Sequence, residues 1–208
     1  FVATNDLSKD GTGNKWSHRP FWPYLAEHGF NPDKIKSQID DAIAQTVIAA
    51  IRSLRTQRNP EVSYELFGFD VMLDKDANVY ILEINISPAM GTSSELDRVI
   101  KTPLNIDLFN MINLPMPGTK VSILNVQENT PAKQYLLLHQ YEETLAKRGD
   151  FRLVFPTKER IDFYNMMTMT ENDKVLSMYA TLDESERIKK LGELRKDFES
   201  YKENRNSK

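Results

Sequence analysis

The chain has 208 residues, 40% of them hydrophobic and 27% charged, with a net charge of −3 at pH 7. This composition suits one large domain or a domain plus an appendage, and it gives no overall attraction to nucleic acid. The absence of cysteine excludes disulfide frameworks, cysteine nucleophiles and Cys-based zinc sites. No apolar run approaches the ~20 residues that span a bilayer, so we expect neither a membrane nor a nucleic acid as partner.

The beginning of the chain is predicted to be irregular, and a long helix follows it. Glycine and proline recur through residues 1–30 and interrupt any regular element. Asn31 and Pro32 suit the N-cap and the first position of a helix. Apolar residues then recur at helical spacing, which predicts an amphipathic helix over 32–55: Ile35, Ile39, Ile43, Val47, Ile51 and Leu54.

A β-hairpin is predicted next. Residues 64–73 and 79–86 are rich in aromatic and β-branched side chains, and the polar run 74–78 between them favours a turn. Ser87-Pro88 ends the second strand.

The second half of the chain is predicted to be helical. Segments 93–111, 131–148 and 183–203 show helical patterns, and Gly149 suits the C-cap of the middle one. Gly118 closes the first unit. Residues 187–208 contain eight Lys or Arg and four Asp or Glu, a local charge of +4.

The hairpin carries the strongest chemical signal. A four-residue loop places Asp74 opposite Val79, and Asp70 then faces Glu83 with Cβ atoms about 5 Å apart. Glu83 and Asn85 share one face, because side chains alternate along a strand. The same register puts Gly68 opposite Asn85 and leaves room above the sheet. The alternate residues, Leu82, Ile84 and Ile86, are expected to point into a core.

Two facing carboxylates repel each other unless another charge compensates them. Asp70, Glu83 and Asn85 offer the hard oxygen ligands that magnesium prefers, and phosphate oxygens commonly complete such a shell. The pattern therefore favours a metal site over a solvent-facing polar row.

These strands resemble the C-terminal ATP-grasp signature of the tubulin tyrosine ligase-like family. The resemblance rests on Tyr64-Glu65-Leu66-Phe67-Gly68-Phe69-Asp70 and Ile81-Leu82-Glu83-Ile84-Asn85-Ile86-Ser87-Pro88. Lys15-Trp16-Ser17 resembles a family segment whose lysine lies near the amino-acid substrate. Phe1-Val2-Ala3 and the stretch from Arg148-Gly149-Asp150-Phe151 to Phe155-Pro156 are similar to the polyglutamylase branch.

The resemblance implies an α+β fold. Residues 1–118 would be the C-terminal half of an ATP-grasp domain, with helices packed on an antiparallel sheet, and residues 119–208 a helical extension. Asp70, Glu83 and Asn85 match the family's magnesium ligands, with Glu83 as the catalytic residue, and Lys15 would bind substrate. No residue is assigned to the nucleotide itself, although ATP and Mg²⁺ are the implied cofactors.

The implied activity is an ATP-dependent carboxylate–amine ligase that adds glutamate to the acidic tails of tubulin. A tail carboxylate would attack the γ-phosphate, and the amine of glutamate would attack the resulting acyl phosphate. We expect a monomer in the cytoplasm on microtubules, with a cilium or basal body as a further location. Arg52, Arg55 and Arg58, or the basic last helix, could steer an acidic polypeptide, although such charge runs are usually plain solvated faces.

Several departures leave alternatives open. The family's His-Leu-Thr-Asn motif does not match Ala3-Thr4-Asn5, and Lys147 stands where a first arginine is usual. The chain opens on Phe1, so we expect a fragment that lacks the upstream half and does not turn over alone. The alternatives are another ATP-grasp ligase and a non-catalytic microtubule-binding fragment or pseudoenzyme.

Overall fold

The computed structural model describes residues 7–54, 64–112 and 130–206. It divides the chain into two compact units, residues 1–106 and 107–208. The domain boundary predicted near residue 118 lies outside the described residues and stays a prediction.

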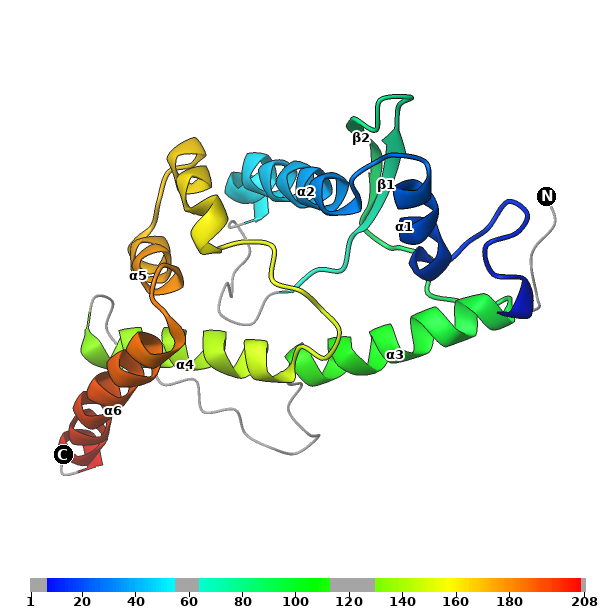
Figure 1. Cartoon of the computed structure of the whole chain (residues 1–208). Coiled ribbons are helices and arrows are strands. Elements are labelled where there is room, and N and C mark those ends of the chain that lie inside the picture. The colour runs from blue at the N-terminus through cyan, green and yellow to red at the C-terminus, as the bar shows by residue number, and fades with distance from the viewer. Residues whose placement is uncertain (1–6, 55–63, 113–129, 207–208) are drawn as a thin grey trace. The chain divides into compact units, whose positions relative to one another are not determined.

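The first unit combines helices with one antiparallel hairpin (Figure 1). Helices α1 (His18–Glu27) and α2 (Pro32–Leu54) precede strands β1 (Gly68–Leu73) and β2 (Val79–Asn85), and helix α3 (Glu95–Ile112) begins in this unit. A short 3₁₀ helix, η1 (Leu7–Lys9), stands before α1. The mixture of helices and a two-stranded sheet agrees with the predicted α+β class.

Helix α2 confirms the expected long helix, with the N-cap where the sequence placed it. The Asn31 side chain accepts hydrogen bonds from the backbone N–H groups of Asp33 and Lys34 at 3.0 and 3.1 Å. Leu25, Ile35 and Ala77 form the buried core of this unit. Helices α1 and α2 are thereby packed against the turn end of the hairpin.

Helix α1 corrects the expectation that residues 1–30 are irregular. Ser17 is its N-cap and accepts a hydrogen bond from the backbone N–H of Arg19. Pro20 falls in the first turn, where a missing N–H loses no helical bond, and only Pro23 removes one from the interior. The two prolines therefore permit the helix that they seemed to exclude.

The second unit is a helical assembly. It contains α4 (Pro131–Lys147), the 3₁₀ helix η3 (Lys158–Met166), α5 (Glu171–Ala180) and α6 (Glu184–Asn206). Its two buried clusters lie where α6 packs on α4, around Phe198, and where α4, α5 and α6 meet, around Leu138 and Tyr179. Helices α3, α4 and α6 confirm the predicted segments, while α5 was not foreseen.

Candidate functional site

The hairpin brings the predicted carboxylates face to face. Asp70 pairs with Glu83 across the strands, and Gly68 pairs with Asn85, as the sequence predicted. Beyond Asp70 the register changes by one residue, so that Leu73 rather than Asp74 faces Val79. The extra residue lies in β2 as a bulge directly beside the acidic pair. Bulges of this kind re-aim side chains next to functional sites.

Electrostatics at this pair match a site that attracts a cation. The pKa of the Asp70 carboxyl is raised, first because the Glu83 carboxyl shares a hydrogen bond with it, and then by desolvation and the negative charge of Glu83. Asn85 donates a hydrogen bond from Nδ2 to Glu83 Oε1 at 3.1 Å, which leaves its amide oxygen available. The three predicted ligands are thus neighbours on one face of the hairpin.

The donor set fits a hard divalent cation such as Mg²⁺. Two carboxylates and an amide supply only oxygen, and all three side chains are exposed at the strand surface. Within residues 7–54, 64–112 and 130–206, no cluster of three or more His, Cys, Asp or Glu side chains suits a metal. The centre therefore depends on an amide as third ligand, and further oxygens would have to come from a bound substrate or water.

The neighbouring apolar residues differ from the expectation. Leu82, Ile84 and Ile86 were predicted to enter a core, but 63%, 40% and 70% of their surface is exposed. The half-buried side of the sheet runs along β1 through Phe69, Val71 and Leu73, whereas in β2 it includes only the residues near the turn, Val79 and Ile81. The space expected above Gly68 is filled as well, because a Cβ atom at this position would meet Pro88 Cβ at 3.0 Å.

Lys15 is held by a residue that the sequence analysis missed. Its Nζ lies 2.8 Å from Asp97 Oδ1, in the first turn of α3. Ser93 Oγ and Ser94 Oγ each donate to the other carboxylate oxygen at 2.9 Å. Ser94 followed three residues later by an acidic residue is a helix-start pattern, and this pattern was the available signal for Asp97. It does not reveal that Lys15 is the partner.

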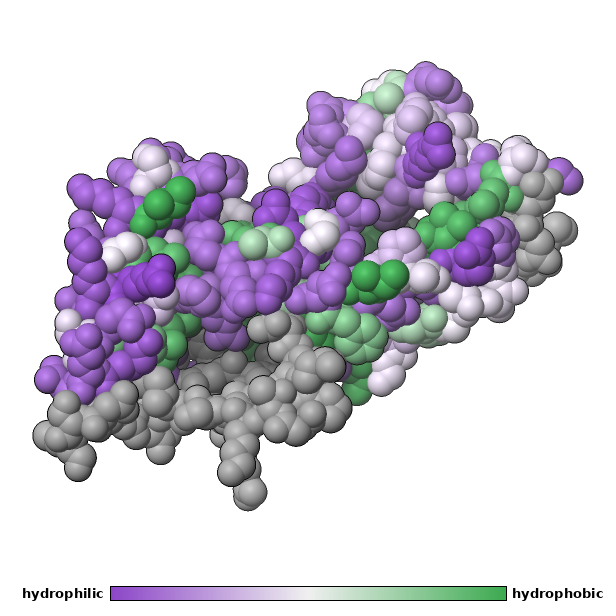
Figure 2. Space-filling model, turned by 90° about the horizontal axis from the view of Figure 1, so that it is seen from below, coloured by the Kyte–Doolittle hydropathy of each residue, from purple (hydrophilic) through white to green (hydrophobic). Residues whose placement is uncertain are grey.

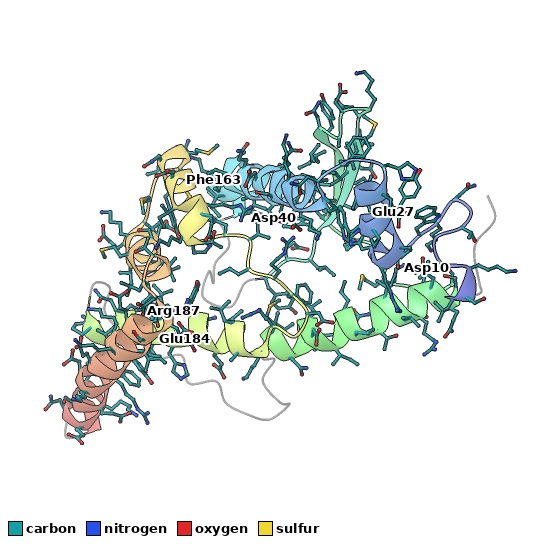
Figure 3. All side chains as sticks on the ribbon, viewed as in Figure 1. Asp10, Glu27, Asp40, Phe163, Glu184 and Arg187 are labelled. Atoms are coloured by element: carbon teal, nitrogen blue, oxygen red, sulfur yellow. The ribbon has the colours of Figure 1, made fainter. Side chains whose placement is uncertain are left out.

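The other residues of the Lys-Trp-Ser segment stabilise its fold. Trp16 Nε1 donates to the carbonyl oxygen of Gly13 at 3.0 Å, and its ring meets Tyr24 edge-on. The carboxylate of Asp10, labelled in Figure 3, accepts hydrogen bonds from the backbone N–H and the hydroxyl of Ser17. These bonds lower the pKa of Asp10. The segment is therefore fixed on both sides of Lys15.

A pocket of about 520 Å³ adjoins this segment. It is lined by Leu7, Asp10, Trp16, Ser17, His18, Arg19, Leu96, Val99 and Ile100. Figure 2 shows hydrophobic side chains among hydrophilic ones along the face that α3 presents from below. Neither the acidic pair nor Lys15 lines this pocket, although Trp16 beside Lys15 and Leu96 beside Asp97 do.

Comparison with known proteins decides the family. The sequence pattern of the tubulin-tyrosine ligase family matches residues 2–122, more than half of the chain. The chain belongs to the tubulin-tyrosine ligase family. The match includes the hairpin with Asp70, Glu83 and Asn85 as well as Lys15 and Asp97, and it confirms the resemblance drawn from the motifs.

Relatives within the tubulin-tyrosine ligase family are similar over different lengths. The tubulin polyglutamylase ttll-4 of Caenorhabditis briggsae is 29% identical over 204 residues, which cover 76% of this chain and 34% of the relative. The human tubulin monoglutamylase TTLL4 is 38% identical over 113 residues, 52% of this chain and 9% of the relative. The mouse tubulin polyglutamylase TTLL5 is 30% identical over 217 residues, 79% of this chain and 16% of the relative. The chain thus spans about a third or less of these relatives.

Among the described residues of this family member, no helix combines the length and the apolar character needed to cross a membrane.

Proposed function

We propose that the chain is part of an ATP-dependent carboxylate–amine ligase that adds glutamate to the acidic tail of tubulin. The observation that carries this proposal is the facing pair of Asp70 and Glu83 with Asn85 beside it, within a stretch that matches the tubulin-tyrosine ligase family. The names of the relatives support tubulin as acceptor and glutamate as the added group.

Asp70, Glu83 and Asn85 would hold Mg²⁺, with Glu83 as the central ligand because it contacts both of the others. When bound, the cation would neutralise the phosphates of ATP and the charge that develops on transfer. The role of the hairpin is to keep three oxygen donors on one rigid surface. Its pre-set geometry reduces the reorganisation that the reaction needs.

The proposed reaction has two steps. A side-chain carboxylate of the tail attacks the γ-phosphorus of ATP, the bond to the β-phosphate oxygen breaks, and ADP leaves. The uncharged amine of glutamate then attacks the acyl carbon, the C–O bond to phosphate breaks, and an isopeptide bond forms with release of phosphate and a proton. No side-chain nucleophile is needed, in agreement with the lack of cysteine. Lys15 would pair with a carboxylate of the incoming glutamate.

Residues 1–118 would complete an ATP-grasp domain with a portion supplied by a longer protein, and residues 119–208 would extend it.

Arg52 lies exposed near the end of α2, and α6 carries exposed lysines and arginines that could attract an acidic tail. Arg55 and Arg58 lie outside the described residues. The enzyme would act as a monomer on cytoplasmic microtubules, including those of a cilium or basal body.

The decisive experiment uses the full-length protein with ATP, Mg²⁺, glutamate and tubulin, followed by mass spectrometry of the tubulin tails. We expect glutamate addition by the wild type and none by Glu83→Gln. Asp76→Asn is the matched control, because Asp76 is an exposed carboxylate in the turn of the same hairpin and pairs with Lys75. Undiminished glutamylation by Glu83→Gln contradicts the proposed site.

The same experiment separates the alternatives. Tubulin that is bound but unmodified by the wild type favours a non-catalytic microtubule-binding role. Consumption of ATP in the presence of a small amine and carboxylate, with tubulin untouched, favours another carboxylate–amine ligase. Transfer of glycine or tyrosine in place of glutamate keeps the reaction class and changes the substrate.

A further inference from the structure

Asp97 is the central residue of a charged cluster outside the metal centre. Its side chain is only 7% exposed, and its Oδ1 lies 2.8 Å from Lys15 Nζ and 3.4 Å from Lys101 Nζ. Two ammonium groups thus converge on one carboxylate oxygen. Because a single negative charge cannot compensate two positive ones, the cluster keeps a net charge of about +1.

The carboxylate itself is fixed from the other side. Ser93 and Ser94 donate to Oδ2, and the Ser94 hydroxyl accepts a hydrogen bond from the Asp97 backbone N–H at 3.1 Å. One oxygen is therefore occupied by serines and the other by lysines. The hydrogen bond from Lys15, followed by those from the two serines, holds the pKa of Asp97 well below its usual range.

The two lysines differ in their exposure and in the number of N–H donors that remain for a ligand. Lys101 also donates to the carbonyl oxygen of Gly91 at 2.9 Å, and 25% of its side chain is exposed. The Lys15 side chain is 40% exposed, and an ammonium group has three N–H donors, of which Asp97 takes one. Lys15 is therefore the more accessible of the two ammonium groups to a soluble anion.

The connection between β2 and α3 joins the candidate metal centre to Asp97. The connection from β2 to α3 starts beside the hairpin, where Pro88 packs over Gly68, the cross-strand partner of Asn85. It ends at Ser93 and Ser94, which hold Asp97. This short segment thus connects the strand that carries Glu83 and Asn85 to Asp97. Asp97 in turn holds Lys15, which lies 82 residues earlier in the chain.

We propose that Asp97 is a positioning residue, which holds the Lys15 ammonium in place so that it can pair with a carboxylate of the incoming free amino acid. This inference rests on the proposed function and names the residue on which that use of Lys15 depends. A lysine on a flexible four-carbon stem loses conformational entropy when it meets an anion. An anchor that fixes the stem beforehand reduces this cost, and the benefit appears in the affinity for that anion.

The test measures steady-state kinetics of full-length protein, with glutamate, ATP and tubulin varied in turn. For Asp97→Asn we expect KM for glutamate to rise about tenfold, because the loss of positioning outweighs the attraction of one more net positive charge, with KM for ATP and for tubulin changed less than about twofold. Glu95→Gln is the matched control. It removes a carboxylate from the same helix turn, where Glu95 pairs with Arg98, and leaves Asp97 with its partners. Its KM for glutamate is expected to equal that of the wild type.

A double-mutant cycle distinguishes positioning from a general structural role. If Asp97 acts through Lys15, Asp97→Asn adds almost nothing to the effect of Lys15→Met. Additive effects, or an unchanged KM for glutamate in Asp97→Asn, overturn the inference. Should Asp97→Asn fail to fold, Ser93→Ala tests the same anchor, since it removes one bond to Oδ2 and is expected to raise KM for glutamate about twofold to threefold.

The outcome for the wild type keeps the two proposals apart. A wild-type protein that transfers no glutamate contradicts the proposed function. An active wild type whose KM for glutamate is insensitive to Asp97→Asn contradicts only the role of Asp97.

Discussion

Asp70 lies directly across the hairpin from Glu83, and the register of the two strands changes by one residue immediately beyond this pair. The pKa of Asp70 is raised, first because the Glu83 carboxyl shares a hydrogen bond with it and then by desolvation and the charge of Glu83, and a bound cation would favour ionisation of both carboxyls. The bulge fixes this arrangement, because a slip of one residue would move Glu83 to the other face.

Magnesium is therefore expected to stabilise the full-length wild type and not Glu83→Gln. In EDTA the variant should melt at the same temperature as the wild type or higher, because one of the two repelling charges is gone. Added Mg²⁺ should raise the Tm of the wild type only, and ligase activity of the variant should fall at least about a hundredfold. Differential scanning calorimetry with and without Mg²⁺ measures the first effect. An equal Mg²⁺-dependent shift in both proteins contradicts the assignment of Glu83 as a ligand.

Gly149 is expected to stabilise the second unit. Its φ is +55°, and a Cβ atom there would collide with the carboxyl group of Asp107, which accepts a hydrogen bond from the Asp150 backbone N–H at 2.9 Å. Gly149→Ala should lower the free energy of unfolding by about 1–2 kcal/mol, because alanine is strained at this positive φ and the Asp107 carboxylate has to move away from its hydrogen bond. Urea denaturation measures this change.

Gly192→Ala is the control for that experiment. Gly192 lies inside α6, where an added Cβ meets no atom within 4 Å. This substitution should stabilise the protein by about 0.5–1 kcal/mol, because alanine loses less entropy in a helix. A loss of stability comparable to that of Gly149→Ala would show that any added methyl group is harmful here, and the specific role of Gly149 would be refuted.

The site end of the hairpin, with Asp70 opposite Glu83, could be predicted, but from a four-residue loop that the structure does not have, because the bulge in β2 compensates for the longer turn. The turn end could not, since the bulge that shifts Leu73 onto Val79 has no clear mark in the sequence. Helix α1 is not evident from its prolines, because a proline breaks a helix in its interior but is tolerated in the first turn, where Pro20 lies. The contact of Lys15 with Asp97 joins residues 82 positions apart, and no local pattern specifies such a pairing.

Tyr179 is expected to make the stability of the helical unit sensitive to alkaline pH. The residue is 2% exposed, its hydroxyl donates to the carbonyl oxygen of Arg187 at 3.3 Å, and burial is the main cause that raises its pKa. Arg187, labelled in Figure 3, also pairs with Glu142 at 3.3 Å. An ionisable group whose pKa is raised on folding keeps its proton in the folded state while the unfolded chain loses it.

The raised pKa of Tyr179 determines how the free energy of unfolding changes with pH. Below the unfolded pKa of about 10 both states are protonated, and this group contributes no slope. Above about pH 10 the unfolded state binds fewer protons, so the free energy of unfolding falls as the pH rises. Tyr179→Phe should lower the free energy of unfolding by about 1 kcal/mol at pH 8. Between pH 9 and 11, the free energy of unfolding of this variant should fall less than that of the wild type. Urea midpoints across this range measure it, and parallel curves for the two proteins contradict it.

Ser17 and Lys15 are separated by one residue, yet they are expected to affect different quantities. Ser17 caps α1 and is held by Asp10, so Ser17→Ala should lower the free energy of unfolding by about 1 kcal/mol. Lys15→Met removes the ammonium that Asp97 holds and should raise KM for glutamate about tenfold. Because the cap stabilises the helix rather than the substrate, Ser17→Ala should leave that KM within about twofold of the wild type at 20 °C. Denaturation curves and glutamate kinetics on the same full-length preparations measure both values. A rise in KM for Ser17→Ala as large as that for Lys15→Met would mean that the segment acts as one unit, and the separate role of Lys15 would have to be abandoned.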